Sequence, residues 1–270
     1  MNDLSRDNSP ADWVAKVPAI TLGFWIIKIL ATTFGEIGGD AVTMSWLGET
    51  TPEASAIAWH PGYLIGTAIF ALVFAAAVAL QIRAPRFNKW LYWFAIIAST
   101  TVGTTLADFA DRSLGIGYPG GSLLLLALLL ATLFTWYRST GTIAVESVRD
   151  GRSELFYWLT ITFSQTLGTA LGDWVSESQS DGYTGSIMIF GGLLLLVTFL
   201  YFTTKVSRTA LFWAAFVLTR PLGAVVGDLL DKPQAQGGLE LSRYGGSLVL
   251  LAAIVLGILI FPQRPATKAH

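Results

Sequence analysis

Four aspartates occupy one repeated position in the sequence, each fifteen residues after a tryptophan. The tryptophans are Trp25, Trp93, Trp158 and Trp213, and the aspartates are Asp40, Asp108, Asp173 and Asp228. Glu36 lies one helical turn before Asp40, and like charges at that spacing repel each other without a cation or a proton. Carboxylates in apolar surroundings need compensating positive charge. These residues therefore predict the binding of a cation, of protons, or of both.

The ligand atoms that this set offers are oxygens. Thr104, Thr169 and Gln165 fall on the same helical face as the aspartates, the chain has two histidines, and it has no cysteine. Oxygen ligands suit Mg²⁺, Ca²⁺, Mn²⁺, Na⁺ or protons, and they disfavour Cu⁺ and Zn²⁺. A bound cation of this kind, divalent or monovalent, is the one cofactor that the sequence suggests. A structural role is the alternative, in which each aspartate binds the start of the helix that follows it.

Two basic residues lie within the same segments. Lys28 precedes Glu36 by two helical turns, and Arg220 precedes Asp228 by two turns. We expect them either to form internal salt bridges or to belong to a charged path along a helix bundle. Five carboxylates against these two cations leave a formal charge of −3 if all are ionised. A different hypothesis pairs Lys28 and Arg220 with the carboxylate of a small organic solute.

The elements that carry these residues are predicted to cross a membrane. Hydrophobic residues make up 53% of the chain and charged residues 13%, about half the ~25% that is typical of soluble domains. A spanning helix needs about 20 largely apolar residues, and eight segments meet this length. Four carry no charge, and four that contain charges alternate with them. The uncharged segments are Gly62–Leu80, Ser113–Tyr137, Gly182–Thr204 and Tyr244–Gln263, and the charged ones are Pro18–Asp40, Trp90–Asp108, Leu155–Asp173 and Thr209–Asp228.

The basic residues predict how these spans are oriented. Twelve of the seventeen Lys and Arg residues lie at the termini or in the connections between the hairpins, and three lie on the opposite side. Because basic residues collect on the cytoplasmic side, we expect a multi-pass protein of the inner membrane with both termini in the cytoplasm. The aspartates then lie near the outer ends of their helices. The net charge of −1 excludes a nucleic-acid binder that relies on basic charge.

The charged and uncharged spans form four copies of one hairpin, at approximately 18–82, 89–138, 154–204 and 208–262. A glycine stands ten residues after each tryptophan, and a small residue precedes each aspartate. The glycines are Gly35, Gly103, Gly168 and Gly223. The first copy differs most, because we expect a longer external loop from Ala41 to Trp59. We expect that segment, with Trp46 and Trp59, to lie on the membrane surface or to cap the bundle.

This pattern resembles a family of bacterial integral membrane proteins built from four tandem repeats. Each repeat of that family has two spans and a characteristic tryptophan, matched here by Trp25, Trp93, Trp158 and Trp213. The resemblance covers the chain from about Pro18 to about Gln263. It implies an all-α membrane fold of eight helices in a single domain. The family's repeat is catalogued as being of unknown function, so the resemblance implies no chemistry.

The repeats predict how the helices pack. Two crossings per repeat give all four copies the same orientation, so we expect equivalent helices around a shared polar axis, unlike the inverted repeats of many transporters. At 100° per residue, nearly every small and polar residue of the charged spans falls within an arc of about 160°. Glycines and other small residues on that arc allow helices to approach closely.

The function that these observations favour is a transporter or channel for a small hard cation, with proton coupling as one form of it. The alternatives are transport of a small anionic organic solute and a non-transporting membrane scaffold or sensor. No catalytic motif stands at a workable position, so we do not expect an enzyme. The expected partners are the lipid bilayer and a small ion or solute. The sequence leaves open whether the protein works as a monomer or as a homodimer.

Overall fold

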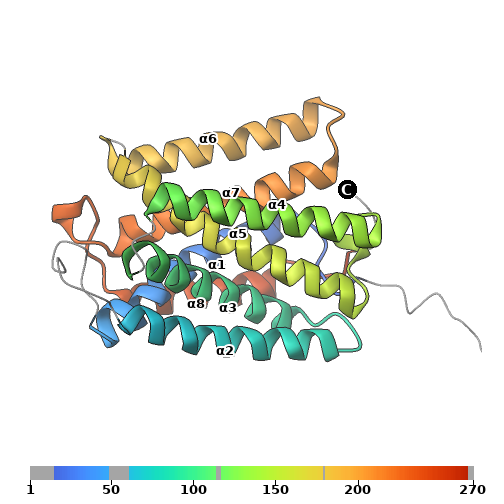
Figure 1. The fold of residues 1–270 in the computed structure, drawn as a ribbon, viewed down its shortest axis with the longest axis horizontal. Helices are drawn as coiled ribbons and strands as arrows, with labels where there is room; N and C mark the ends of the chain where they lie inside the picture. Colours follow the sequence, from blue (N-terminus) through green and yellow to red (C-terminus); the bar gives the residue numbers. More distant parts are fainter. Residues whose placement is uncertain (1–14, 49–60, 114–116, 179, 267–270) are drawn as a thin grey trace, which may run out of the picture.

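The computed structural model describes residues 15–48, 61–113, 117–178 and 180–266, and these residues fold into eight long helices without a β-sheet (Figure 1). The helices run roughly parallel to one another as a bundle. Their bounds are α1 Leu22–Asp40, α2 Pro61–Arg83, α3 Lys89–Asp108, α4 Tyr118–Thr140, α5 Gly151–Ser178, α6 Gly182–Thr203, α7 Arg208–Asp231 and α8 Arg243–Ile260. The expected all-helical architecture is confirmed.

Seven of these helices are long and apolar enough to cross a membrane, and α5 is the exception. The hydropathy of α5 is reduced by Glu154 and by a run of hydroxyl and amide side chains that includes Ser164, Gln165 and Thr169. All of these side chains are buried in the bundle. Polar side chains that face neighbouring helices lower the hydropathy of a segment, but they are not exposed to lipid. The low hydropathy of α5 is therefore compatible with a place inside the bundle.

The helices that carry the aspartates extend further than expected. Asp40 and Asp108 are followed by π-helical turns, Ala41–Trp46 and Phe109–Ser113, while α5 and α7 continue beyond their aspartates as α-helix. The expectation that the segment from Ala41 forms a loop is therefore wrong for its first six residues. Thr43 and Met44 of this turn are buried, and Trp46 is exposed. Trp59 lies outside the described residues.

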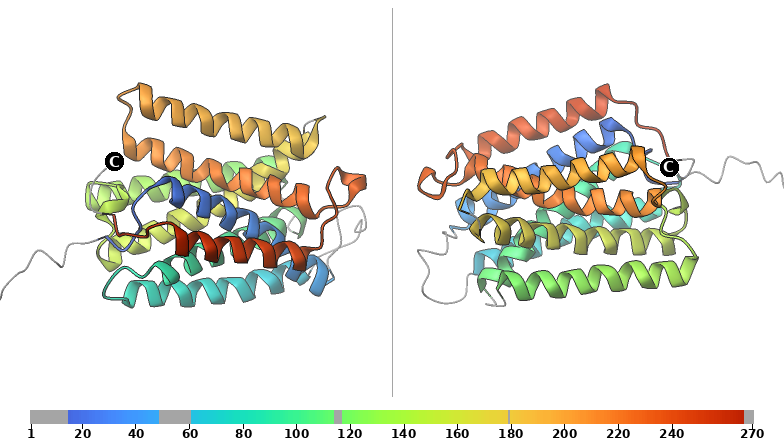
Figure 2. Two further views of the ribbon diagram at one scale, coloured as in Figure 1. Left: turned by 180° about the vertical axis from the view of Figure 1, so that it is seen from behind. Right: turned by 90° about the horizontal axis from the view of Figure 1, so that it is seen from above.

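Four helices form an inner ring in which α1 packs against α3 and α7, and α5 also packs against α3 and α7. The other four lie outside it (Figure 2). Each outer helix packs mainly on the inner helix of the following repeat: α2 on α3, α4 on α5, α6 on α7 and α8 on α1. The hairpins therefore interlock around the ring rather than forming separate pairs.

A belt of aromatic side chains closes one end of the ring and accounts for the repeated tryptophans. In each inner helix an aromatic residue precedes the tryptophan and packs on the tryptophan of the next inner helix. The pairs are Phe24–Trp93, Tyr92–Trp158, Tyr157–Trp213 and Phe212–Trp25, with ring centroids 5.5, 5.9, 6.1 and 5.7 Å apart. All four pairs are tilted, and aromatic contacts of this kind stabilise a core beyond simple area burial. The tryptophans therefore hold neighbouring repeats together.

The two ends of the described chain meet at this same end of the bundle. Pro18 and Pro265 form an antiparallel bridge. The amide of Ala19 donates to Arg264 at 2.7 Å, and the amide of Ala266 donates to Val17 at 2.8 Å. These bonds join the last repeat to the first.

Candidate functional site

The repeated glycines lie where neighbouring inner helices approach most closely. A Cβ atom placed on any of them would come within 3.0 Å of side-chain atoms of the next helix. Gly35 faces Thr100, Gly103 faces Gln165, Gly168 faces Arg220, and Gly223 faces Thr32. The facing residues all stand seven positions after their tryptophans. Neighbouring inner helices therefore meet in register, at the same level of each repeat.

Side-chain hydrogen bonds between the inner helices follow this register. Thr100 donates to the carbonyl of Ala31 at 3.1 Å, and Thr32 donates to the carbonyl of Thr219 at 3.2 Å. The Gln165 amide donates to the hydroxyl of Ser99 at 3.4 Å. These hydroxyl and amide groups are buried, so each needs a hydrogen-bond partner. By binding acceptors on the next inner helix, they also join the two helices.

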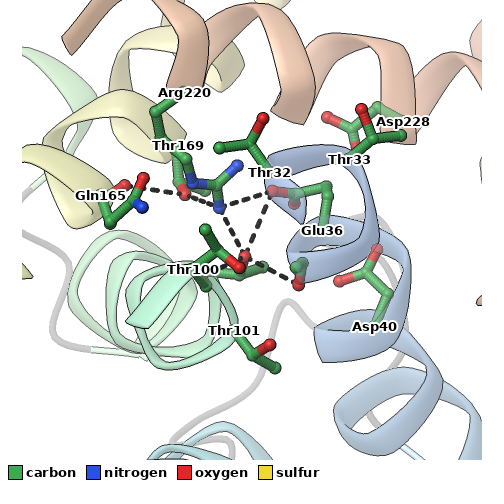
Figure 3. A network of polar contacts seen from close by, with 12 residues as sticks. Thr32, Thr33, Glu36, Asp40, Thr100, Thr101, Gln165, Thr169, Arg220 and Asp228 are labelled. Atoms are coloured by element: carbon green, nitrogen blue, oxygen red, sulfur yellow. Dashed lines mark hydrogen bonds and ion pairs between the residues drawn. The ribbon is translucent and has the colours of Figure 1, made fainter. Parts of the chain in front are cut away.

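Arg220 occupies the centre of the ring (Figure 3). It extends from α7, and its Nη2 donates to Glu36 of α1 at 3.0 Å, Thr104 of α3 at 2.6 Å and Thr169 of α5 at 2.5 Å. The side chain is fully buried. One guanidinium nitrogen therefore binds all three other inner helices, and Arg220 fills the axis at this level.

Three carboxylates come together further along the axis, on the side of Arg220 that is away from the aromatic belt. Glu36, Asp40 and Asp228 are buried, and each offers an oxygen that lies within 4.8 Å of the other two. Figure 3 shows Glu36 between Arg220 on one side and the two aspartates on the other. Oδ1 of Asp40 has no hydrogen-bond partner among the described residues. The group has the ligand type and spacing that a hard cation requires.

Lys232 lies against two of these carboxylates. Its Nζ bonds to Asp40 and lies 3.2 Å from Asp228, four residues earlier in the chain. Arg243, at the start of α8, pairs with Asp231 at 2.6 Å. Lys232 and Arg243 are two of the three basic residues that the sequence places on the outer side of the membrane, so the predicted site lacks both. The spacing of four residues between Asp228 and Lys232 was the available signal, but α7 was expected to end at Asp228.

These pairs change the expected charge balance. Glu36, Asp40, Asp228 and Asp231 face Arg220, Lys232 and Arg243. Four carboxylates against three cations leave one negative charge if all are ionised. The −3 expected from the sequence refers to a different set, which includes Asp108, Asp173 and Lys28 and leaves out Asp231, Lys232 and Arg243. Arg220 forms one of the internal salt bridges that the sequence allows, and its carboxylate partner Glu36 belongs to α1.

Asp108 and Asp173 are buried but lie outside the group of three. The structure thus brings together the aspartates of the first and last repeats, with Glu36, and does not gather the four aspartates into one cluster. Thr104 belongs to the surroundings of the group, because its hydroxyl lies 3.3 Å from Glu36. Thr169 is the equivalent of Thr104 in the third repeat and accepts from Arg220 at 2.5 Å, and Gln165 stands one helical turn before it in α5, against Gly103.

Lys28 lies deeper along the axis, towards the aromatic belt. Its Nζ donates to the hydroxyl of Thr219 at 3.2 Å and lies 3.8 Å from the centre of the Phe216 ring. The side chain is fully buried. Its partners among the described residues are a hydroxyl, a carbonyl at 3.5 Å and an aromatic face, so Lys28 does not pair with Glu36.

The chain matches the model of a known protein family. The family model described as Repeat of Unknown Function (DUF347) matches four times, at residues 23–87, 91–142, 156–207 and 211–264. No curated protein and no solved structure matches the chain. The four matches follow the four repeats read from the sequence and cover most of the chain. The chain therefore belongs to the family built from this repeat.

Proposed function

We propose that the protein is a membrane transporter that binds a small divalent cation at Glu36, Asp40 and Asp228. The observation that carries this proposal is the group of three buried carboxylates with oxygens within 4.8 Å of one another. Ca²⁺ takes oxygen ligands at about 2.3–2.6 Å, and Mg²⁺ at about 2.0–2.1 Å. Oxygens at this spacing can share one such ion.

The local charges support exchange of the cation for Lys232. The three carboxylates and Arg220 leave two negative charges when Lys232 withdraws. A divalent cation neutralises both of them. With Lys232 in place one negative charge remains, and one proton neutralises it. Binding of the ion then releases the Lys232 ammonium and a proton, which gives the coupling to protons a physical basis.

Arg220 supports a gated rather than an open pathway. Its contacts with Glu36, Thr104 and Thr169 fill the axis between the carboxylate group and Lys28. A cation at Glu36 competes with Arg220 for the same carboxylate. Transport therefore requires that Arg220 changes partners, which couples occupation of the site to opening of the axis.

The proposed membrane arrangement has eight crossings, with four two-helix repeats in the same orientation around a polar axis. The in-register contacts of Gly35, Gly103, Gly168 and Gly223 support this arrangement, because equivalent positions meet on neighbouring helices. The Lys and Arg distribution supports cytoplasmic termini in an inner membrane. The aspartates then face the outside, and the aromatic belt faces the cytoplasm.

The alternatives have less support from the site. A carboxylate-bearing solute would bind Lys28 and Arg220, but Arg220 is already paired with Glu36. A scaffold without transport is consistent with the packed axis, but it gives no reason for burying three carboxylates beside one another. Substitution of a buried ion cluster by apolar residues is often neutral or stabilising, so stability alone does not explain these carboxylates.

Uptake of Mn²⁺ or Ca²⁺ into proteoliposomes tests the proposal. Asp40→Asn, Asp228→Asn and Glu36→Gln each remove one ligand charge, so we expect each to lower initial uptake at least tenfold. Asp173→Asn is the matched control, because Asp173 is a buried aspartate of the same repeat position outside the group, and we expect uptake to be retained. Uptake that falls equally in all four variants, or in none, would contradict the proposed site.

A further inference from the structure

A cavity of about 440 Å³ lies at the opposite end of the bundle from the carboxylate group, between α6 and the faces of α1 and α7. Its walls are largely apolar and include Trp25, Ile29, Leu194, Val197 and Phe212. In Figures 1 and 2, α6 lies at the edge of the bundle and covers α7. A cavity with such walls fits a hydrocarbon chain.

The depth of the cavity matches one leaflet of a bilayer. Its lining along α7 runs from Arg208, the first residue of the helix, to Thr219. Eleven residues at about 1.5 Å each span about 16 Å. The hydrocarbon core of a bilayer is about 30 Å thick, so one leaflet contributes about half of that. The cavity therefore has the length of one acyl chain that enters from the bilayer surface.

The mouth of the cavity carries more basic than acidic groups. Arg208 and Glu146 are the charged residues among the described lining. The Arg208 guanidinium lies 4.3 Å from the centre of the Tyr201 ring and donates to the Tyr201 carbonyl. Lys205 lies in the same connection, and Arg149 donates to the carbonyl of Glu146 at 2.9 Å. Arg208 lines the mouth, and Lys205 and Arg149 lie in the connections next to it, so three basic residues and the Glu146 carboxylate belong to these segments.

Two helices also begin at this mouth. Thr21 caps the start of α1 and Ser207 caps the start of α7, and Thr21 and Thr209 both line the cavity. The first turn of a helix has free amide groups and the positive end of the helix dipole. Arg208 is the first residue of α7, so its guanidinium and the start of that helix together favour a phosphate group.

We propose that this cavity binds an anionic glycerophospholipid, with one acyl chain between α6, α1 and α7 and the phosphate at Arg208. The proposal is independent of cation transport, because the carboxylate group lies at the other end of the same helices. The lipid fills the gap beside α6 and ties this helix to α1. The last two repeats are thereby held to the first through a lipid chain.

Native mass spectrometry of the full-length protein in detergent tests this proposal, with phosphatidylglycerol and phosphatidylcholine of identical chains as probes. A basic residue near a membrane surface contributes about 1 kcal/mol to binding of acidic lipid, which is about fivefold in affinity. We therefore expect Arg208→Gln to lower retention of phosphatidylglycerol about fivefold and to leave phosphatidylcholine unchanged. Arg138→Gln, an exposed basic residue at the end of α4, is the matched control and should behave as the wild type.

Variants that fill the cavity provide the second part of the test. Ala215→Trp on α7 and Val197→Trp on α6 each place a large side chain in the cavity, so we expect both to lose the retained lipid while the protein stays folded. Two variants on different helices guard against misfolding of either one. Equal retention of the two lipids by the wild type, or unchanged phosphatidylglycerol retention in a folded tryptophan variant, would overturn the proposal.

Discussion

At the scale of single residues, two departures from the repeat pattern bring a basic side chain and a carboxylate together. Arg220 stands where the first two repeats have Thr32 and Thr100 and the third has Gln165, so one hydrogen-bonding position has become a cation. Glu36 is the equivalent departure in the first repeat, at the position of Thr104 and Thr169. These two departures meet each other in the structure at 3.0 Å. The asymmetry of the fourth and first repeats therefore creates the charged site.

The Arg220–Glu36 pair gives a stability prediction. Removing one partner of a buried ion pair leaves an uncompensated charge and costs about 3–5 kcal/mol. We expect Arg220→Met and Glu36→Gln each to lower the thermal midpoint of unfolding in detergent, with Arg220→Met the larger effect because it also releases Thr104 and Thr169. The double variant should be more stable than the sum of the single losses predicts. Additive losses would show that the two residues do not interact.

The sequence was sufficient to place Glu36, Asp40 and Asp228 on the inner faces of their helices, because helical periodicity decides which face a residue occupies. It was not sufficient to separate them from Asp108 and Asp173, which stand at the same repeat position. Asp40 and Asp228 differ from the other two aspartates because both contact Lys232, which lies one turn beyond the expected end of α7. The contact between Lys232 and Asp40 joins the ends of two helices that are distant in the sequence, and local sequence carries no signal for it.

At the scale of elements, the inner helices depend on glycine for their spacing. Gly223 would meet Thr32 if it carried a Cβ atom, whereas Gly191 on the outer helix α6 has open space around it. The repeated glycines, and the register that they imply, could be read from the sequence. The interlocking of each outer helix with the next repeat could not, because outer helices are apolar on all sides and their sequence does not select a partner.

This difference between glycines gives a second stability prediction. Overpacking a close helix contact costs about 1–3 kcal/mol, so Gly223→Val should clearly lower the thermal midpoint of unfolding. Gly191→Val meets no neighbouring atom and should change stability by no more than about 0.5 kcal/mol. Equal effects of the two substitutions would show that the inner ring is not closely packed at Gly223.

At the scale of the whole molecule, the ring is closed by contacts between its last and first repeats. Gly223 of α7 meets Thr32 of α1, Phe212 packs on Trp25, and the backbone at Ala19 joins Arg264. The carboxylate group and the apolar cavity, for which we propose a cation and a lipid, both lie along this junction. The composition predicts a membrane protein, but the polar inner face of α5 makes the number of crossings a question for experiment.

The natural absence of cysteine makes the crossing of α5 directly testable. Arg138→Cys places a thiol at the end of α4, before α5 begins, and Ser180→Cys places one after α5 ends. If α5 spans the membrane, an impermeant maleimide applied to intact spheroplasts should label Ser180→Cys and not Arg138→Cys. Inverted vesicles should give the opposite pattern. Labelling of both positions from one side would mean that α5 does not cross.

The cation site itself is tested most directly by anomalous diffraction from crystals grown with Mn²⁺. We expect one anomalous peak between Glu36, Asp40 and Asp228, at about 2–2.6 Å from carboxylate oxygens, with the Lys232 ammonium moved away from Asp40. The Lys232→Met variant should show the same peak at lower Mn²⁺ concentration, because no tethered cation competes for the aspartates. An empty site with Lys232 still bound to Asp40 at saturating Mn²⁺ would contradict the proposed exchange.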